Sequence, residues 1–566
     1  MRRGGSSALA ALMADDKSEA LRLALPGGAT LIAAGETSGM VYVLEAGRLA
    51  AVTADDPPRL LGLIWPGEAI GEISVLADIP HTATVIAVRD CELLAMPREA
   101  FLAAAEKHPA ILVELMRTMI QRARSERAPQ RLAITFGFLA AGEGPPLRDF
   151  VERLRRCVER HGVKTTLLTA EHLPQPTEWF SQVEEQHDSV FYVAEAGETS
   201  WAAQCTRQAD RIFFVGRADQ AIKAQSLAAR TNLKPADLVL VHPADSARPS
   251  GGCLWQEALG CRSVFHARDG DEADIARLAR VITGRSVGVV LSGGGARGYA
   301  HVGALRALRE HGVPIDFVGG ASMGAVIAAG TAQGWDDAEM TARVRAAFVD
   351  TNPLSDLAVP LIALTRGHVV ERRLQENFGD IDIVDLWRPY YCVSSDLTNG
   401  RHIVHDRGLL RHALRASIAL PGILPPVVDG DTVLVDGGVM RNLPVDLMLD
   451  RHDGPIIAVD VSIDTGLCPK DIETPKSFLR WVLSGAWRKG APIVSLLLRS
   501  ATVTANRDVI AARGQADVFV APELDGVEIR DWRAFEPAVD AGYRAMTRAL
   551  KTLDGPLTEL RLRRGP

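Results

Sequence analysis

The chain has 566 residues, which is too long for one hydrophobic core and predicts roughly three or four domains. Hydrophobic residues make up 47% and charged residues 23%, an average globular composition that excludes disordered, collagen-like and coiled-coil classes for most of the length. The net charge of -7 disfavours nucleic acid as the main partner. The 7 cysteines form no CxxC pair, so neither a disulfide framework nor a zinc site is expected.

No leader or spanning segment is apparent. The basic N-terminus is followed by an apolar stretch that is too short for a signal peptide. No run of about 18 uncharged apolar residues occurs, so no membrane-spanning helix is expected. We expect a cytoplasmic protein whose contact with a membrane is peripheral, at the inner membrane surface.

Short strand-like runs separated by glycine turns fill the region from residue 21 to 100. These runs are 29–33, 40–44, 48–52, 59–65 and 81–88. A helical pattern begins at Pro97 and extends to about residue 123. The polar stretch 121–130 is typical of a linker. This part of the chain is therefore predicted to be a small β domain followed by helix.

Near-continuous apolar runs alternate with helical stretches between residues 131 and 285. The runs are 132–136, 164–169, 189–194, 211–215 and 237–242. Strands with this pattern are buried on both faces, so the segment is predicted to form a small parallel α/β sheet. The GxxxxGK[ST] motif is absent, and no triphosphate site is expected.

A glycine-rich loop, Gly293 to Gly298, lies between a predicted strand and a predicted helix. Its spacing matches the dinucleotide fingerprint. That interpretation needs an acid at the end of the next strand, and Asp316 stands before that strand instead. The alternative is that backbone N–H groups of the loop, at a helix N-terminus, bind one negative oxygen.

Ser322 lies in a G-x-S-x-G motif, Gly320 to Gly324, between a strand and a helix of small residues. Small neighbours let a strand turn sharply into a helix and expose the serine hydroxyl. A serine in an ordinary packing turn is the alternative. The position of the motif, shortly after the glycine loop, favours a nucleophile.

Ser322 needs a base to remove its proton. One candidate is Asp436, which ends a predicted strand and precedes two glycines; a plain turn residue is the alternative for this aspartate. A Ser-Asp-His triad is the rival arrangement. Its histidine would be one of His402, His405, His412 and His452. Asp436 is the better placed candidate.

Four motifs resemble those of patatin-like phospholipases in order and spacing. They are the glycine loop, the serine motif, a proline-rich block at 416–426 and Asp436 with its two glycines. The resemblance covers residues 286–450 and implies Ser322 as nucleophile and Asp436 as base, with no metal or other cofactor. The residues that it implies for the oxyanion hole are Gly293, Gly294, Gly295 and Arg297.

Three further residues near these motifs are expected to be structural. Ser417 and Pro421, in the proline-rich block, are expected to fix a loop that lines the site. His301 follows the glycine loop and is expected to lie on the helix, where it packs behind the site.

The segment from Gly71 to residue 85 resembles the phosphate-binding cassette of cyclic-nucleotide-binding domains. The resemblance implies a β-roll, with Gly71 and Glu72 at the ribose hydroxyl and Thr82 beside the residue that clamps the cyclic phosphate. The clamp position, usually arginine, holds His81, which cannot form a bidentate contact and is mostly neutral at pH 7. We expect a retained fold without regulation by cyclic nucleotide.

Together the segments resemble the neuropathy target esterase subfamily, in a form without a membrane anchor. We predict a multidomain fold. Its parts are a cyclic-nucleotide-binding-like β-roll with flanking helices (1–126), a degenerate parallel α/β domain (127–285), a patatin-like α/β hydrolase domain (286–450) and an extension that completes it (451–566). Trp201 and Cys205 are expected to pack in the middle domain.

The expected activity is hydrolysis of acyl esters in phospholipids or lysophospholipids, through an acyl-enzyme, with release of fatty acid. The alternative is a regulatory scaffold that senses lipid or nucleotide and whose hydrolase domain is inert, which the intact Ser322 and Asp436 disfavour. Two apolar stretches, 353–364 and 491–498, are candidates for a lipid-facing surface, with ordinary core helices as the alternative. Because the net charge is negative, transient membrane contact is expected to be apolar and insensitive to salt.

Overall fold

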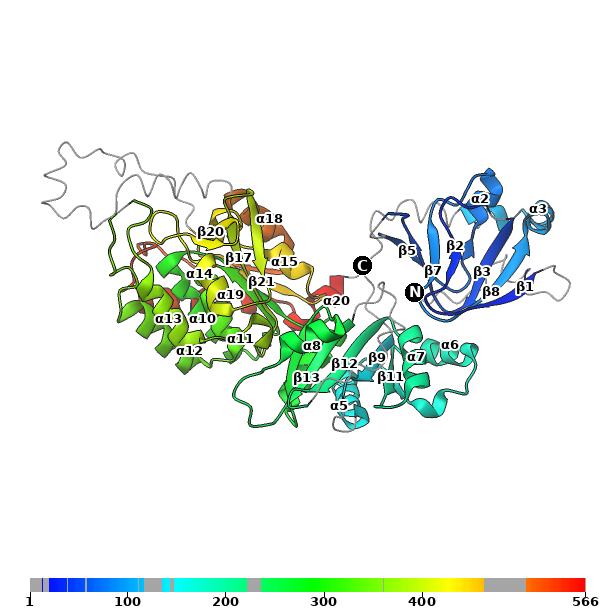
Figure 1. The fold of residues 1–566 in the computed structure, drawn as a ribbon, viewed down its shortest axis with the longest axis horizontal. Helices are drawn as coiled ribbons and strands as arrows, with labels where there is room; N and C mark the ends of the chain where they lie inside the picture. Colours follow the sequence, from blue (N-terminus) through cyan, green and yellow to red (C-terminus); the bar gives the residue numbers. More distant parts are fainter. Residues whose placement is uncertain are drawn as a thin grey trace, which may run out of the picture. The chain divides into compact units, whose positions relative to one another are not determined.

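The computed structural model describes residues 13, 20–37, 39–55, 59–109, 111–113, 115–116, 135–142, 147–220, 236–359, 361–462 and 505–564. The chain divides into two compact units. The first comprises residues 1–239 and 256–263, and the second comprises residues 240–255 and 264–565. Figure 1 follows the elements of both units along the chain.

The first unit begins with two four-stranded antiparallel sheets, in the orders β1-β8-β3-β6 and β2-β7-β4-β5. Apolar side chains from the facing strands form their cores. The strands are β1 (Leu21–Leu25), β2 (Thr30–Ile32), β3 (Met40–Ala46), β4 (Leu49–Val52), β5 (Leu60–Ile64), β6 (Ala69–Ile70), β7 (Thr84–Ala87) and β8 (Cys91–Pro97). Helices α2 (Glu72–Ala77) and α3 (Arg98–Lys107) flank them. The predicted runs 29–33, 40–44, 48–52, 59–65 and 81–88 coincide with β2, β3, β4, β5 and β7, whereas β1, β6 and β8 were not singled out.

A six-stranded sheet follows, in the order β10-β11-β9-β12-β13-β14, with parallel pairing from β10 to β12. Its strands are β9 (Thr135–Ala140), β10 (Thr165–Leu168), β11 (Ser189–Ala194), β12 (Arg211–Arg217), β13 (Ala236–His242) and β14 (Val264–Arg268). Its helices are α5 (Leu147–Glu159), α6 (Thr177–Gln186), α7 (Thr199–Gln208), α8 (Gly252–Leu259) and α9 (Glu272–Ile282). Trp201 and Cys205 are buried, as expected, and the Trp201 indole donates to the Val193 carbonyl at 2.7 Å. The strand β14 was missed.

Ion pairs join the β-rich part of the first unit to its α/β part. Arg48 pairs with Asp210 at 2.5 Å, and Arg89, which follows β7, pairs with Glu184 at 2.5 Å. These four side chains are nearly inaccessible to solvent. Removing one partner of a buried ion pair leaves the other charge buried without a partner, which typically destabilises the fold by about 3–5 kcal/mol. The contacts therefore hold the two parts of the first unit together.

The N-terminus of α5 is capped by a carboxylate of the same chain. The two oxygens of Glu195 accept hydrogen bonds from the backbone N–H groups of Leu147 at 3.2 Å and Arg148 at 2.8 Å. In a strand–loop–helix unit this helix end is the usual place for a bound phosphate. Here Glu195 supplies the negative charge that the helix end attracts.

The second unit is built on an eight-stranded sheet in the order β19-β20-β17-β16-β15-β21-β22, with β18 paired to β17. The five strands β17, β16, β15, β21 and β22 pair in parallel. The strands β18, β19 and β20 pair with their neighbours in antiparallel fashion. The strands are β15 (Gly288–Leu291), β16 (Phe317–Ala321), β17 (Tyr390–Asp396), β18 (Arg401–His405), β19 (Val427–Asp429), β20 (Thr432–Asp436), β21 (Ile456–Val459) and β22 (Val518–Val520). Helices of small and apolar residues pack against it to form one continuous core.

The helices of the second unit that matter for the site flank the central strands. They are α10 (Tyr299–Glu310), α11 (Met323–Gln333), α12 (Asp337–Val344), α13 (His368–Phe378), α14 (Leu410–Ser417), α15 (Val445–Leu449), α18 (Ala505–Gln515), α19 (Phe535–Lys551) and α20 (Leu560–Arg564). A Cβ on Gly303 would lie 1.8 Å from the Val539 carbonyl oxygen, and a Cβ on Gly542 would lie 1.8 Å from the Ala300 carbonyl oxygen. Helices α10 and α19 therefore pack with their backbones in contact, which only glycine allows (Figure 1).

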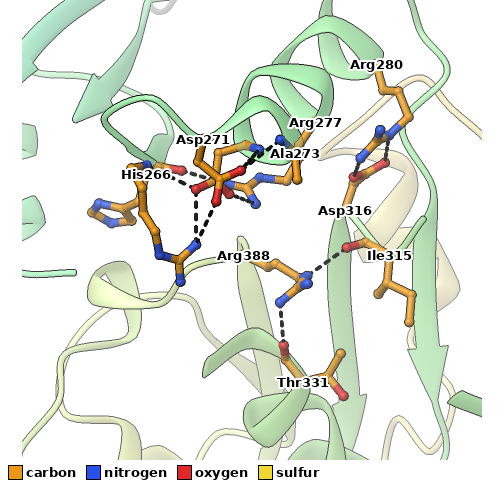
Figure 2. Close-up of polar contacts among 11 residues, drawn as sticks. His266, Asp271, Ala273, Arg277, Arg280, Ile315, Asp316, Thr331 and Arg388 are labelled. Atoms are coloured by element: carbon orange, nitrogen blue, oxygen red, sulfur yellow. Dashed lines mark hydrogen bonds and ion pairs between the residues drawn. The ribbon is translucent and has the colours of Figure 1, made fainter. Parts of the chain in front are cut away.

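Polar contacts fix the start of β16 (Figure 2). Arg280, on α9, forms two hydrogen bonds with Asp316 at 2.9 and 2.6 Å. The partly buried Arg388 donates to the carbonyls of Ile315 and Thr331, both at 2.9 Å. These residues stand just before β16 and near the end of α11, so the strand and the helix on either side of Ser322 are tied together at their far ends.

The two apolar stretches have different outcomes. The described residues of the first stretch, 353–359 and 361–364, form no helix, so the core-helix alternative is wrong for them. Side chains at its tip are strongly exposed. The stretch 491–498 lies outside the described residues. Among the helices that the structure describes, none is long and apolar enough to cross a bilayer.

Candidate active site

Ser322 occupies the turn between β16 and α11. Its backbone has φ 52 and ψ -125, a conformation that L-residues rarely adopt and that marks stored strain. A Cβ on Gly320 or Gly324 would lie 2.4 or 2.3 Å from the Leu291 carbonyl oxygen. Glycine on both sides therefore allows β15 to approach the turn closely, and the sharp turn presents the serine at the carboxyl edge of the sheet.

Asp436 ends β20 and lies against Ser322. Ser322 Oγ donates to Asp436 Oδ2 at 2.6 Å, and the Gly438 N–H donates to Asp436 Oδ1 at 2.8 Å. The carboxyl is buried, and burial raises its pKa to about 6 although both hydrogen bonds favour the charged form. A carboxylate with this pKa can accept a proton near neutral pH.

The glycine loop lies beside the serine. A Cβ on Gly293 would be 2.9 Å from Ser322 Cβ, so the loop backbone approaches the serine as closely as glycine permits. Gly295 has φ 56 and begins the short 3-10 turn that leads into α10. The N–H groups of Gly294 and Gly295 donate to no other residue in the part of the chain that the structure describes. They remain available to a negative oxygen.

Arg297 is placed differently from a donor to an oxyanion. Its guanidinium donates to the carbonyls of Val461 at 2.8 Å, Leu524 at 2.9 Å and Val527 at 3.0 Å, and its backbone N–H donates to Gly294. Both groups are thus engaged within the protein. We assign Arg297 to anchoring the glycine loop on the segment that follows β22.

Asn442 was missed in the sequence. Its Oδ1 accepts from the Gly293 N–H at 3.1 Å, and its Nδ2 donates to the Gly293 carbonyl at 3.3 Å. A Cβ on Gly438 would lie 2.8 Å from the same Oδ1. This side chain therefore bridges the glycine loop to the turn after Asp436. Its place six residues beyond Asp436, shortly after the two glycines of that motif, was the available signal.

Two other serines position the pair. The Ser417 hydroxyl accepts the Ser322 N–H at 3.1 Å, in agreement with the structural role expected for it. Ser395, on β17, donates to the Asp436 carbonyl at 2.9 Å and accepts the Met440 N–H at 3.1 Å. No local sequence pattern pointed to Ser395, because its contact arises only when β17 pairs with β20.

Two of the candidate histidines, His405 and His452, contact other residues. His452 stacks on Phe317 with 4.8 Å between ring centroids, at the start of β16, whereas Ser322 follows the end of that strand. His405 is hydrogen-bonded to the Ser394 hydroxyl at 2.8 Å. His301 is buried in α10 and donates to the Ser292 carbonyl at 2.8 Å, and burial lowers its pKa to about 4. His301 packs behind the loop, as expected.

A small apolar pocket with a cavity volume of about 30 Å³ lies along α11. Val326, whose N–H donates to the Ser322 carbonyl at 3.3 Å, lines it, and so does Ile418, which follows Ser417. Phe348, Pro353 and Leu374 contribute to the remaining wall. The pocket therefore starts within one helical turn of the serine.

Comparison with known proteins places the chain. A "Patatin-like phospholipase" family model matches residues 289–449, and a "Neuropathy Target Esterase family P-loop like domain" model matches residues 134–268. An uncharacterized NTE family protein of Mycobacterium tuberculosis is 31% identical over 93% of this chain and 91% of its own length. The chain belongs to the NTE family. The expected resemblance to the neuropathy target esterase subfamily is confirmed.

Other NTE relatives are larger. Lysophospholipase nte1 of Aspergillus fumigatus is 27% identical over 91% of this chain but only 41% of its own length. The human patatin-like phospholipase domain-containing protein 6 is 28% identical over 92% of this chain and 44% of its own length. This chain thus spans less than half of these eukaryotic relatives. Family and relatives together indicate a lipid hydrolase.

The N-terminal part of this NTE family member matches a "Cyclic nucleotide-binding domain" model over residues 22–108. The predicted multidomain fold, with a β-rich domain of this type and a C-terminal patatin domain, is thereby confirmed in outline. The catabolite activator protein of Thermus thermophilus aligns with 26% of this chain and 65% of its own length at 25% identity. Its TM-score of 0.18 is too low to carry a structural argument.

The cassette residues of this domain surround a buried histidine. Gly71 has φ 83 and precedes α2, whose first residue, Glu72, is buried. His81 is buried and its Nδ1 is hydrogen-bonded to the Ser74 hydroxyl at 2.9 Å. Burial lowers the pKa of His81, so the ring is neutral at pH 7. Thr82 is exposed. The side chain at the clamp position is therefore uncharged and folded inward onto α2.

Proposed function

We propose that this NTE family member hydrolyses acyl esters of lysophospholipids or phospholipids, with Ser322 as nucleophile and Asp436 as general base. The observation that carries the proposal is the 2.6 Å hydrogen bond between Ser322 Oγ and Asp436 Oδ2 at a strained strand-to-helix turn. The names of the fungal relatives, which are lysophospholipases, support the substrate class.

The chemistry follows from the two side chains. Ser322 Oγ attacks the acyl carbonyl while its proton passes to Asp436 Oδ2. The tetrahedral intermediate collapses, and the alcohol part of the lipid leaves with that proton, as a glycerophosphodiester from a lysophospholipid or as a lysophospholipid from a diacyl phospholipid. An acyl ester remains on Ser322. Water then attacks the acyl-enzyme, Asp436 accepts its proton, and fatty acid is released with Ser322 restored. The raised pKa of Asp436, about 6, suits both transfers.

Backbone N–H groups of the glycine loop are proposed to hold the oxyanion. Gly294 and Gly295 carry N–H groups with no described acceptor, and α11 begins directly after Ser322, so its N-terminus adds to the positive potential. The Gly293 N–H is bonded to Asn442 instead. We assign Asn442 to positioning: it holds the loop against the turn that carries Asp436.

The apolar pocket along α11 is proposed to receive the acyl chain. It begins beside Ser322, and an aliphatic chain placed there would leave water for a wall of apolar side chains. Arg343 and Arg373 also line the pocket, but its accessible surface is almost entirely apolar. The pocket thus supports an ester of a fatty acid.

The N-terminal domain is proposed to keep its fold without a response to cAMP or cGMP. His81 supports this because a neutral ring bonded to Ser74 offers no charge-assisted hydrogen bond to a phosphate. The rival function, a sensing scaffold with an inert hydrolase domain, has no observation in its favour at Ser322 and Asp436.

The test is labelling by a fluorophosphonate probe, followed by measurement of fatty acid released from a panel of lysophospholipids and diacyl phospholipids. The purified chain should be labelled and should release fatty acid, and Ser322→Ala should do neither. A correctly folded chain that neither reacts with the probe nor hydrolyses any lipid of the panel would support the scaffold instead.

A further inference from the structure

A small hairpin of apolar residues projects from the second unit. Its arms are residues 356–359 and 361–366, joined by an antiparallel bridge between Leu357 and Thr365 and by the bond from the Ala358 N–H to the Leu364 carbonyl at 2.9 Å. We call it the apolar hairpin. At its tip Val359 is 76%, Leu361 87% and Ile362 73% exposed. Such exposure of three large apolar side chains on one tip demands a partner.

The base of the apolar hairpin is fixed to the catalytic domain. Leu364 packs against the main core, and the Thr365 N–H donates to the Ile423 carbonyl at 3.1 Å. The Asp356 carboxylate accepts the His368 N–H at 2.7 Å and so caps α13. These contacts fix the base of the apolar hairpin and so keep its tip exposed.

The apolar hairpin adjoins the proposed acyl pocket. Pro353, three residues before Asp356, is buried in the pocket wall. Ile423, which receives the bond from Thr365, belongs to the same segment as Ile418, another residue of that wall. An acyl chain that enters the pocket from a bilayer would therefore pass close to the apolar hairpin.

The composition of the hairpin selects the partner. Residues 357–365 carry no charge, and they are flanked by Asp356 and by the exposed Arg366. A protein partner needs roughly 800 Å² on each side, which a tip of three side chains does not offer. An uncharged tip of large apolar side chains is typical of surfaces that enter the headgroup–acyl boundary.

We propose that the apolar hairpin docks this protein on a phospholipid surface and brings the acyl pocket to that surface. The proposal rests on the proposed function, because it takes the pocket to be the acyl site. It deepens that function by separating the surface that finds the lipid aggregate from the residues that cleave the ester.

The test compares the full chain with a double variant, Leu361→Asp with Ile362→Asp. Ile510→Asp is the matched control, since Ile510 is 74% exposed but lies on α18. Flotation with phosphatidylcholine vesicles is measured across a salt series, together with hydrolysis of a water-soluble short-chain ester and of lysophosphatidylcholine carried in those vesicles.

We expect the wild type and Ile510→Asp to float at all salt concentrations. The double variant should bind vesicles about tenfold less and cleave vesicle-borne lipid about tenfold more slowly, while hydrolysis of the water-soluble ester stays within about twofold. Equal flotation of all three proteins would overturn the proposal, as would a wild-type dimer that dissociates in the double variant. If the wild type floats but cleaves no ester, the proposed function fails and the docking surface stands.

Discussion

The glycine loop of the second unit and the expected ligand sites of the first unit differ in whether their polar groups have partners within the protein. Beside Ser322, the N–H groups of Gly294 and Gly295 have no described acceptor. In the first unit the corresponding features are filled from within: the Glu195 carboxylate accepts the N–H groups at the start of α5, and His81 is turned onto Ser74. One unit thus has backbone N–H groups with no described acceptor, and in the other the comparable groups have partners from the same chain.

This difference teaches that a fold and its ligand site are retained separately. The first unit keeps buried strands and well-packed cores, which need only apolar side chains of suitable volume. A phosphate site needs charged or N–H groups left without internal partners, and such groups are easily satisfied by one new side chain. Family models recognise the former and cannot report the latter.

The largest effect that would sharpen the comparison is the loss of Ser322. Ser322→Ala should lower ester hydrolysis by at least about 10⁴-fold with an unchanged circular dichroism spectrum, because no other nucleophile lies on the strained turn. His405→Ala and His452→Ala serve as controls and should keep activity within about tenfold. A histidine variant as inactive as Ser322→Ala, and equally well folded, would replace the dyad by a triad.

The ionised form of Asp436 should support hydrolysis but lower the stability of the fold. Hydrolysis should fall about tenfold per pH unit below pH 6, where the base becomes protonated. Burial of this carboxylate raises its pKa above 3.8, so the charged form at pH 7 destabilises the fold, and the penalty vanishes as the pH falls below the unfolded value.

Asp436→Asn should therefore be almost inactive yet raise the free energy of unfolding at pH 7 by up to about 2–3 kcal/mol. Thermal unfolding at pH 7 and at pH 4 measures it, and the gain should shrink at the lower pH. A variant less stable than the wild type at pH 7 would show that the ionised carboxylate is a stabilising group.

Asn442 should have a smaller effect, on the reaction rate in particular. Asn442→Ala removes both side-chain bonds to the Gly293 peptide and frees the glycine loop. We expect kcat on a water-soluble ester to fall about 10- to 100-fold with little change in KM, since a misplaced oxyanion donor weakens only transition-state binding. Asn442→Asp keeps the acceptor but not the donor and should lie between. A pure rise in KM would contradict the positioning role.

Glu195 tests whether its carboxylate has replaced a ligand. Glu195→Gln leaves a weaker acceptor at the start of α5 and should lower the stability of the first unit by about 1 kcal/mol, seen in thermal unfolding. Ester hydrolysis should be unchanged. If added phosphate restores the lost stability of the variant but does not affect the wild type, the helix end is a phosphate site that Glu195 has closed.

Cyclic nucleotide should have the smallest effect. Titration calorimetry of the full chain with cAMP and cGMP should detect no binding at micromolar concentrations, because each missing charge-assisted hydrogen bond is worth about 1.5–3 kcal/mol. The same titration is repeated with His81→Arg, for which binding is expected only if Glu72 faces the ribose. Micromolar binding to the unmodified chain would show that the first unit is open after all.

Sequence patterns predicted the turn that carries Ser322 and the strand that ends at Asp436, because both are local arrangements of a strand and small residues. Sequence patterns did not predict the residues whose contacts reach across the sheet. Ser395 meets Asp436 only through the pairing of β17 with β20, and Asn442 reaches Gly293 across 149 positions of sequence. Arg297 was expected at the oxyanion because it lies in the loop, but its carbonyl partners come from residues far along the chain. The predicted domain limits stay predictions.

The anchoring of the glycine loop sets an order of events during synthesis. The Ala296 N–H donates to the Ile529 carbonyl at 2.8 Å, and Arg297 is held by Leu524 and Val527. These partners leave the ribosome more than 200 residues after the loop does, and α19, which packs on α10, follows them. A nascent chain thus exposes its serine turn long before the loop beside it is secured. If Ser322 acts as proposed, the glycine loop that assists it is secured only after residues 524–529 have been synthesised.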